Sequence, residues 1–253
     1  MALPTPPTVE QTYYVILPLL RRVGQLLLSR QRELVGLSDK QRHVKAQEIE
    51  TEIRSFLSTT LHQLFPAHSV HGETGSTNAP WQWVINAFDG GRYFFRGLPL
   101  FTTSLALREK GEVVLGVVLE PATGNVFSAR KGEGASLSGR PLAVSEQKEL
   151  AGAVAYVTND KPAATALTGA GAVHVDLDCL SLGLCYVAAG AYDIVVAPTD
   201  SVSLFKSAAA LLVAREAGAL LTDKAGVPLG SSKQTSILVT TKHLQKKTVT
   251  ILA

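Results

Sequence analysis

Three short segments of the chain carry side chains suited to metal or acid–base chemistry. In residues 83–91 (WVINAFDGG), an apolar run ends in a turn that holds the amide of Asn86 and the carboxylate of Asp89. Residues 72–75 (GETG) place a carboxylate between glycines, and residues 204–209 (LFKSAA) open an alanine-rich run. Each segment lies at the end of a regular element, which is where chains usually position functional groups.

Glu73 and Asp89 are two acids in glycine-rich loops after strands. Acids in such places bind hard cations such as Mg²⁺ through oxygen. The alternative is that both acids only form turns, because Asp before Gly is common in turns and two carboxylates are few for a cation cage. The residues by themselves leave both interpretations open.

Composition restricts the class of protein. The 253 residues are 46% apolar and 18% charged, which is typical of a compact globular chain rather than a disordered one. The net charge of +3 is spread along the chain without a basic block, so we expect no nucleic-acid partner. The first residues do not resemble a signal peptide and no apolar run has membrane-spanning length, so we expect a cytoplasmic protein without a membrane partner. Cys179 and Cys185 are expected to be reduced thiols in or near the core.

Hydrophobic spacings of three and four predict a helix from Val9 to about Arg30 and another from about Val44 to Leu64, ending before Pro66. Short apolar runs between Gly and Pro then predict an antiparallel meander, with a tight turn at residues 120–125 and a glycine-rich loop over 132–139. The predicted strands are 70–71, 83–85, 102–108, 113–119 and 125–130.

The second half of the chain alternates strands with helices. Strands are predicted over 154–157, 173–175, 194–197, 219–222 and 236–240, and helices over 180–189 and 207–217, the latter closed by Gly218. Alternating helix and sheet layers make the expected fold an α/β (α+β) layered sandwich. We expect an N-terminal lobe over 1–150, with two helices on an antiparallel sheet that carries the candidate site, and a C-terminal α/β lobe over 151–253.

Five segments, in order, resemble the inositol monophosphatase family, most closely its archaeal-type branch that acts on inositol monophosphate and fructose 1,6-bisphosphate. They are HGETG (71–75), WVINAFDGGRYFFRGLPLF (83–101), GVVLEPATGNVFSARKGEGASLSGRPL (116–142), LSLGLCYVAAGAYDIVVAP (180–198) and SAAALLVAREAGALLTDKAG (207–226). The resemblance implies the layered sugar phosphatase fold, a homodimer, and Mg²⁺-dependent hydrolysis of phosphomonoesters. In that chemistry four carboxylates hold the metals, and the metals activate the attacking water.

Matched to the family motifs, the chain lacks several of the expected groups. Glu73 keeps the first Glu of G-E-E, but Thr74 replaces the second. In the segment that resembles D-P-I-D-G-[TS], Asn86 replaces the first Asp, Asp89 keeps the second, and Gly91 replaces the hydroxyl that helps to orient water. Of the four usual metal carboxylates, two are missing, the first at position 86 and the second at the start of the Ala-rich helix.

The Ala-rich helix contributes the second loss. Lys206 stands where the family has a metal-binding Asp; if the loop register differs by one residue, Asp200 approaches the metal instead. Farther upstream, Glu48 and Glu52 match the early acidic motif, although Lys45 stands where the family usually has Thr.

These replacements change the charge of the expected site by +3, since Asp to Asn adds +1 and Asp to Lys adds +2. A protonated amine has no lone pair to offer a metal. We therefore predict that Lys206 lies among Glu73 and Asp89 as a built-in cation. A phosphate would then be bound by Lys206 and the N–H groups of Gly90 and Gly91. Arg92 follows the motif and is a further candidate for contacting an anion.

The sequence thus predicts an inositol monophosphatase-like protein with a degraded magnesium site, inactive or very weak as a phosphatase, that keeps a pocket for a small phosphorylated ligand or a regulatory role. No cofactor is expected, or Mg²⁺ if any. One alternative is an active phosphomonoesterase with Mg²⁺ on Glu73, Asp89 and the Phe88 carbonyl, assisted by Glu48. Another is a scaffold without a ligand that uses the apolar face of the first helix.

Overall fold

The computed structural model describes residues 7–70, 79–199, 205–230 and 234–252. Two long helices are followed by a seven-stranded sheet in the order β1-β2-β3-β4-β5-β6-β7, and the rest of the chain forms a five-stranded sheet in the order β11-β12-β10-β8-β9 with four further helices. The elements are α1 (Val9–Arg32), α2 (Asp39–Leu64), β1 (Ser69–Val70), β2 (Trp81–Asp89), α3 (Gly91–Phe95), β3 (Thr102–Glu109), β4 (Glu112–Glu120), β5 (Asn125–Arg130), β6 (Ala135–Leu137), β7 (Arg140–Pro141), β8 (Val154–Val157), α4 (Lys161–Gly169), β9 (Val173–Val175), α5 (Leu180–Ala188), β10 (Ile194–Pro198), α6 (Ala208–Glu216), β11 (Leu220–Thr222), β12 (Ser236–Thr240) and α7 (Gln245–Leu252).

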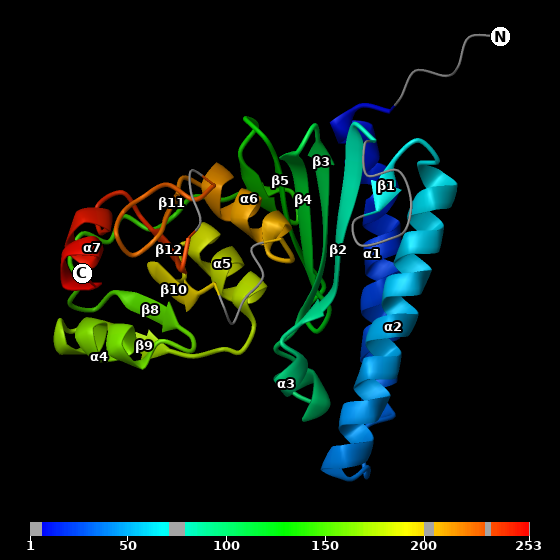
Figure 1. Cartoon of the computed structure of the whole chain (residues 1–253), viewed down its shortest axis with the longest axis horizontal. Helices are drawn as coiled ribbons and strands as arrows, with labels where there is room; N and C mark the ends of the chain where they lie inside the picture. The colour runs from blue at the N-terminus through cyan, green and yellow to red at the C-terminus, as the bar shows by residue number, and fades with distance from the viewer. Residues whose placement is uncertain (1–6, 71–78, 200–204, 231–233, 253) are drawn as a thin grey trace.

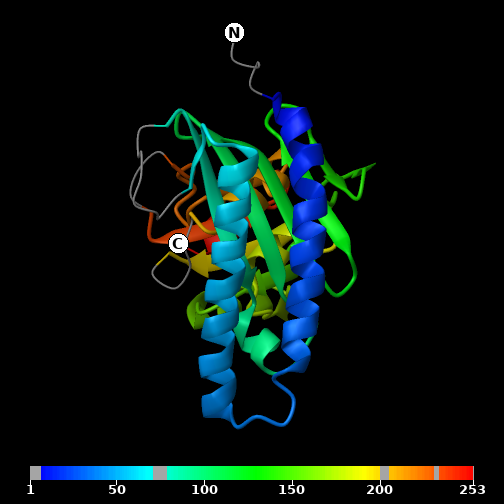
Figure 2. The same ribbon diagram turned by 90° about the vertical axis from the view of Figure 1, so that its right-hand side faces the viewer.

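These elements stack in five layers, which Figure 1 shows edge-on. The pair α1 and α2 covers one face of the first sheet, and α5 and α6 lie between the two sheets. The helices α4 and α7 cover the far face of the second sheet. Viewed from the side of the helix pair, α1 and α2 run side by side across the strands (Figure 2). Each interface between layers buries the apolar side of its strands and helices, as a layered fold requires.

The first sheet has an apolar core on each face. Alternate residues of a strand point to opposite faces, so β2 sends Trp83 and Ile85 toward α1 and α2 and sends Val84 toward α5 and α6. In β5, Val126 packs in the outer core, which lies beneath α1 and α2, and Phe127 packs in the inner core, which lies around α5 and α6. Burial on both faces explains why the strand runs predicted from the sequence are nearly continuous in apolar residues.

Two glycines bring helices unusually close to β4. A Cβ on Gly116 of β4 would lie 2.6 Å from the carbonyl oxygen of Ala209 in α6, and a Cβ on Gly24 of α1 would lie 2.5 Å from Leu119 Cδ2. Both distances are shorter than real Cβ contacts, so neither position accepts a side chain without movement of its neighbours. The strand β4 therefore packs on the backbone of α6 at one face, and at its other face α1 packs directly on the Leu119 side chain.

The structure confirms the α/β layered sandwich. It also corrects several details. The helix predicted from Val44 begins at Asp39, because Ser38 and Gln41 form a capping box. The loop expected over 132–139 contains the short strand β6 and leads into β7, and the strand pair β1–β2 is parallel rather than antiparallel. The helices α3, α4 and α7 were not predicted.

The chain passes from the first sheet to the second between Pro141 and Val154. A single apolar core nevertheless joins Val84, Val118 and Phe127 of the first sheet to helices α5 and α6 and to strands β10 and β12. The division into lobes over 1–150 and 151–253 therefore stays a prediction.

Two other features follow from the described coordinates. Cys179 and Cys185 are both buried and neither forms a disulfide, and burial raises the pKa of both thiols. Within the part of the chain that the structure describes, no helix is long and apolar enough to cross a membrane.

The contact between β4 and α6 predicts a large effect of a small substitution. Gly116→Ala should lower the free energy of unfolding by about 1–3 kcal/mol, because the new methyl group meets helix backbone that cannot rotate away. Gly169→Ala in α4, where an added Cβ meets nothing within 4 Å, is the matched control and should be neutral or slightly stabilising. Urea unfolding curves of the two variants would test this, and equal stability would contradict the packing described here.

Candidate functional site

A pocket of about 300 Å³ lies where the end of β2 meets α2, α3 and the segment before α6. We refer to it as the Asp89 pocket. It brings together residues from four distant parts of the sequence, which are Ala46, Gln47, Glu50, Phe88, Asp89, Gly90, Gly91, Arg92, Phe95, Asp178 and Lys206. Three carboxylates and two cationic side chains thus face one small volume.

The local path of β2 positions the acid that gives the pocket its name. The pairing of β2 with β3 is regular as far as Asn86, opposite Ser104, and shifts before it resumes at Asp89 opposite Thr102. Such an irregularity re-aims the side chains at the end of a strand. Asn86 remains buried, with 5% of its surface exposed, whereas Asp89 is half-buried and lines the pocket.

The Asp89 carboxylate is fixed by two backbone N–H groups. Its Oδ1 accepts a hydrogen bond from Gly90 N at 2.9 Å, and its Oδ2 accepts one from Ser181 N at 2.8 Å, in the first turn of α5. A carboxylate at a helix N-terminus pairs with otherwise unsatisfied N–H groups and with the positive end of the helix dipole. Asp89 therefore ties the first sheet to the middle helix layer, and each oxygen keeps a lone pair for another partner.

Gly90 has a backbone conformation that allows this bond. Its φ is +88°, in the left-handed region, and an added Cβ would lie 2.4 Å from the Leu100 carbonyl oxygen. The chain therefore requires glycine at this turn. Gly91 differs, because its φ is not positive and an added Cβ would meet nothing closer than the Phe88 ring at 3.4 Å. The Gly90 N–H group was predicted to bind phosphate, but in the structure it donates its hydrogen bond to Asp89.

Lys206 reaches the pocket from the turn before α6. Its Nζ lies 3.9 Å from Glu50 Oε1, and its side chain is 53% exposed. The same oxygen of Glu50 accepts a hydrogen bond from Arg54 Nη2 at 3.3 Å. Lys206 and Asp89 line the same pocket, and Glu50 of α2 is an acid in contact with the ammonium group.

At the other side of the pocket Arg92 pairs with Asp178, with 3.3 Å between Nε and Oδ2. Burial raises the pKa of the Asp178 carboxyl, Arg92 opposes that shift, and the nearby Asp89 adds to it. Burial is the main cause of the shift, and the repulsion by Asp89 is a smaller contribution that the Arg92 guanidinium opposes. The pair is largely exposed at Arg92, so it contributes little to stability.

The described residues that line the pocket fit a magnesium ion poorly. Mg²⁺ needs near-octahedral oxygen ligands, preferably charged ones. Asp89 can offer an oxygen, but Glu50 shares its oxygen with two cations and Asp178 is paired with Arg92. A dication would also face the Lys206 ammonium group across the pocket. Over residues 7–70, 79–199, 205–230 and 234–252, no three His, Cys, Asp or Glu side chains are grouped as a metal site would need.

Other predicted site residues lie elsewhere. Glu48 pairs with Lys45 at 3.4 Å and Glu52 with Arg30 at 2.6 Å, and neither lines the Asp89 pocket. Glu50 is the acid that the sequence analysis missed. Helical spacing could have found it, because Glu50 follows buried Ala46 by one turn whereas Glu48 lies on another face.

Glu73, Thr74 and Asp200 lie outside the described residues. Phe88 lines the pocket and its ring stacks on Phe94, with 4.9 Å between the ring centroids. Phe94 is fully buried, as expected of an apolar aromatic residue, and Phe95 packs against the outer core.

Comparisons with known proteins place this geometry in a family. Residues 8–253 match the model of the inositol monophosphatase family. The chain belongs to this family. Among relatives, it is 31% identical over 222 residues to a fructose-1,6-bisphosphatase/inositol-1-monophosphatase of Thermotoga maritima, covering 82% of this chain and 83% of that one. It is 30% identical over 226 residues to the Nus factor SuhB of Pseudomonas aeruginosa, covering 81% and 83%.

Solved structures of the inositol monophosphatase family agree with the fold. A Thermotoga maritima IMPase superposes with a TM-score of 0.82 at 25% identity, covering 95% of this chain and 96% of that one. The extragenic suppressor protein SuhB of Bartonella henselae superposes with a TM-score of 0.82 at 22% identity, covering 95% and 98%. The layered sandwich is therefore that of the family.

The bonds of Asp89 predict a structural role that needs no metal. Asp89→Ala should lower the free energy of unfolding by about 1–2 kcal/mol in buffer with EDTA, because it removes the acceptor of Ser181 N at the start of α5. Asp178→Ala, which removes an acid of the same pocket paired with an exposed arginine, is the matched control and should change stability far less. Equal losses in urea unfolding would show that Asp89 does not hold α5.

Proposed function

We propose that this chain is an inositol monophosphatase-family protein without effective Mg²⁺-dependent phosphatase activity, whose Asp89 pocket binds a small phosphorylated ligand directly. The observation that carries the proposal is the position of Lys206. Its ammonium group lies in the pocket, beside Glu50, at the sequence position where the resemblance leads us to expect a metal-binding carboxylate.

Electrostatics support this assignment. Each of the three acids that line the pocket has a positive partner within the chain. Glu50 lies beside Lys206 and Arg54, and Asp178 pairs with Arg92. Asp89 accepts a hydrogen bond from the Ser181 N–H group at the start of α5. A phosphate in the pocket would be within reach of two cationic side chains, Lys206 and Arg92. Each of them carries several N–H donors, so it can bind an anion while it keeps its partner in the chain. The positive charge of the dication that family members bind is thereby supplied in this chain by fixed cationic side chains.

Hydrolysis needs more than a bound phosphate. In the family an activated water attacks the phosphorus, and this chain has Gly91 where the resemblance places the hydroxyl that orients that water. Groups that act together lose most of their rate enhancement when one is removed. Several changes in one site therefore favour a binding or regulatory protein over an efficient phosphatase.

A second candidate is a phosphomonoesterase that keeps one Mg²⁺. It is favoured by the presence of Asp89, Glu50 and the Phe88 segment in the same pocket, and by the name of the Thermotoga maritima relative. In that case Glu73, Asp89 and the Phe88 carbonyl would supply ligands, with Glu50 taking the place expected for Glu48. Mg²⁺-dependent release of phosphate distinguishes this candidate from the leading proposal.

The names of other relatives point to a role beyond hydrolysis. Those of Pseudomonas aeruginosa and Escherichia coli are named Nus factor SuhB. A regulatory role, with a second copy of the chain or another protein as partner, is consistent with a pocket that binds a ligand without consuming it. A scaffold without any ligand remains the contrasting class, and stabilisation by phosphate separates the two.

Metal-free binding gives the first test. Inorganic phosphate and inositol 1-phosphate should bind the wild-type chain in EDTA, and Lys206→Gln should weaken binding by about tenfold or more, because it removes a charge-assisted hydrogen bond. Lys45→Gln is the control, since Lys45 pairs with Glu33 and Glu48 and does not line the pocket. Calorimetry that finds the same affinity in both variants would refute a role of Lys206 in binding.

Activity gives the second test. With Mg²⁺, the wild-type chain should release phosphate from inositol 1-phosphate no faster than the Asp89→Ala variant. The triple variant Asn86→Asp, Gly91→Thr, Lys206→Asp restores the groups expected from the family, and Gly91 has room for the added side chain. This variant should gain Mg²⁺-dependent activity. Turnover by the wild type that Mg²⁺ stimulates and Asp89→Ala abolishes would favour the phosphomonoesterase instead.

A further inference from the structure

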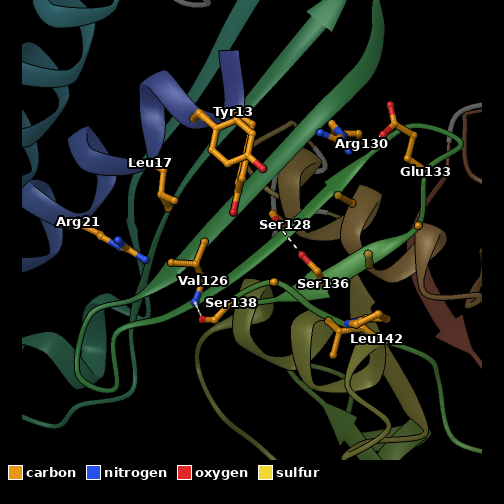
Figure 3. A pocket seen from close by; sticks show the side chains of 16 residues that line it. Tyr13, Leu17, Arg21, Val126, Ser128, Arg130, Glu133, Ser136, Ser138 and Leu142 are labelled. Carbon is orange, nitrogen blue, oxygen red and sulfur yellow. Dashed lines mark hydrogen bonds and ion pairs between the residues drawn. The ribbon is translucent and has the colours of Figure 1, made fainter. Parts of the chain in front are cut away.

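A larger concavity lies on another face of the molecule, with a volume of about 480 Å³. We call it the Tyr13 groove. It lies between the N-terminal half of α1 and the end of the first sheet formed by β5, β6 and β7 (Figure 3), and it shares no lining residue with the Asp89 pocket. It arises because α1 packs on β3 and β4, so the last strands extend past the helix.

The sheet side of the groove is lined by hydroxyl groups. Ser128 of β5 is paired in register with Ser136 of β6, and their Oγ atoms lie 3.0 Å apart. Ser138 accepts a hydrogen bond from Val126 N at 3.2 Å. On the opposite face of the same strands, Phe127, Ala129 and other apolar residues pack into the inner core. Ser128 is only 7% exposed, whereas Ser136 is partly buried and Ser138 is exposed, so the three hydroxyl groups extend from a buried position to the surface.

The helix side presents one stripe of α1. Tyr13, Leu17 and Arg21 follow one another at intervals of four residues and therefore lie along one face. Eight residues of α-helix span about 12 Å, which sets the length of a ligand that would reach from Tyr13 to Arg21. Tyr14, which is 61% exposed, adds a second phenol, and its ring meets that of Tyr13 edge-on.

Charge distinguishes the two ends of the groove. Figure 3 shows Arg21 at one end and Arg130 beside Glu133 at the other. Arg130 is neutralised by Glu133 at 2.5 Å and by Glu10 at 3.4 Å. Among the residues that the structure describes, Arg21 forms no ion pair or hydrogen bond, so its guanidinium group provides a positive charge for an anion.

We propose that the Tyr13 groove is a second ligand site, which binds a sugar or polyol phosphate. The phosphate binds Arg21, the hydroxyl groups of the ligand exchange hydrogen bonds with Ser128, Ser136 and Ser138, and its carbon skeleton packs on Tyr13 and Leu17. The volume suits a ligand of this size, and mixed apolar and hydroxyl walls suit a polyhydroxylated ring better than a purely apolar one. Because no residue is shared with the Asp89 pocket, occupancy of the groove does not require the function proposed for that pocket.

The test uses the full chain in EDTA, with Lys206→Gln as the background so that the Asp89 pocket is weakened. Glucose 6-phosphate is the probe, glucose lacks the phosphate, and inorganic phosphate lacks the sugar. Glucose 6-phosphate should bind this background protein better than either control compound. Adding Arg21→Gln should weaken its binding at least about tenfold, a change that calorimetry or ligand-observed NMR resolves. Arg22→Gln is the matched control, since Arg22 lies over the Phe56 ring and outside the groove.

Each outcome decides the proposal. Binding that Arg21→Gln weakens and Arg22→Gln leaves unchanged supports it, and a further loss with Ser136→Ala would locate the sugar. Arg21 is exposed, so its replacement leaves the fold intact, and unchanged thermal unfolding verifies this. Absence of binding in the background protein, or binding that Arg21→Gln does not alter, overturns the second site. Loss of phosphate binding on Lys206→Gln alone concerns the Asp89 pocket and leaves this result unaffected.

Discussion

The two hydrogen bonds of the Asp89 carboxylate determine how the candidate site is built. One bond closes the turn at Gly90, and the other reaches Ser181 in the first turn of α5. The end of the first sheet is thereby joined to the middle helix layer, and α3 and the Arg92–Asp178 pair are positioned around that junction. The remaining walls come from α2 and from the turn before α6, and α6 itself packs closely on β4 at Gly116.

Charge balance is the second constraint on this site. Three acids in a small, partly buried volume repel one another unless positive groups lie among them. In our proposal, bound metal supplies this charge in family members that hydrolyse phosphomonoesters, and Lys206, Arg54 and Arg92 supply it in this chain. Of these three acids, Asp89 is the one that the family motif assigns to the metal, and its carboxylate is held by N–H groups of the protein itself. Such a site can keep its shape, and its attraction for an anion, without an activated water.

Much of the fold could be predicted because its signals are local. The spacing of Ile16, Leu20, Val23 and Leu27 marks the buried face of α1, and the turn at residues 120–125 separates β4 from β5 as expected. The misses have physical causes as well. The helices α4 and α7 present few buried apolar residues, so periodicity gives a weak signal, and the start of α2 is set by the Ser38–Gln41 capping box rather than by apolar spacing.

The site was harder to predict than the fold. Sequence order could identify Asp89, Lys206 and Arg92 as candidates, and the structure places all three in one pocket. It could not indicate that Asp89 would accept a bond from Ser181, because the two residues are 92 positions apart. Motif matching also selected Glu48 in place of Glu50, because it does not consider which face of the helix each acid lies on. In the structure Glu50 lies beside Lys206, whereas Glu48 pairs with Lys45.

The central claim is that fixed cations have taken the place of bound metal, and titration of Mn²⁺ tests it most directly. Electron paramagnetic resonance counts free Mn²⁺ as the ion is added to the wild-type chain and to Lys206→Asp, each with and without inorganic phosphate. The account predicts no saturable binding to the wild type at millimolar Mn²⁺ and measurable binding once the lysine is replaced by a carboxylate. Saturable binding to the wild type, strengthened by phosphate and unchanged in the variant, would contradict it.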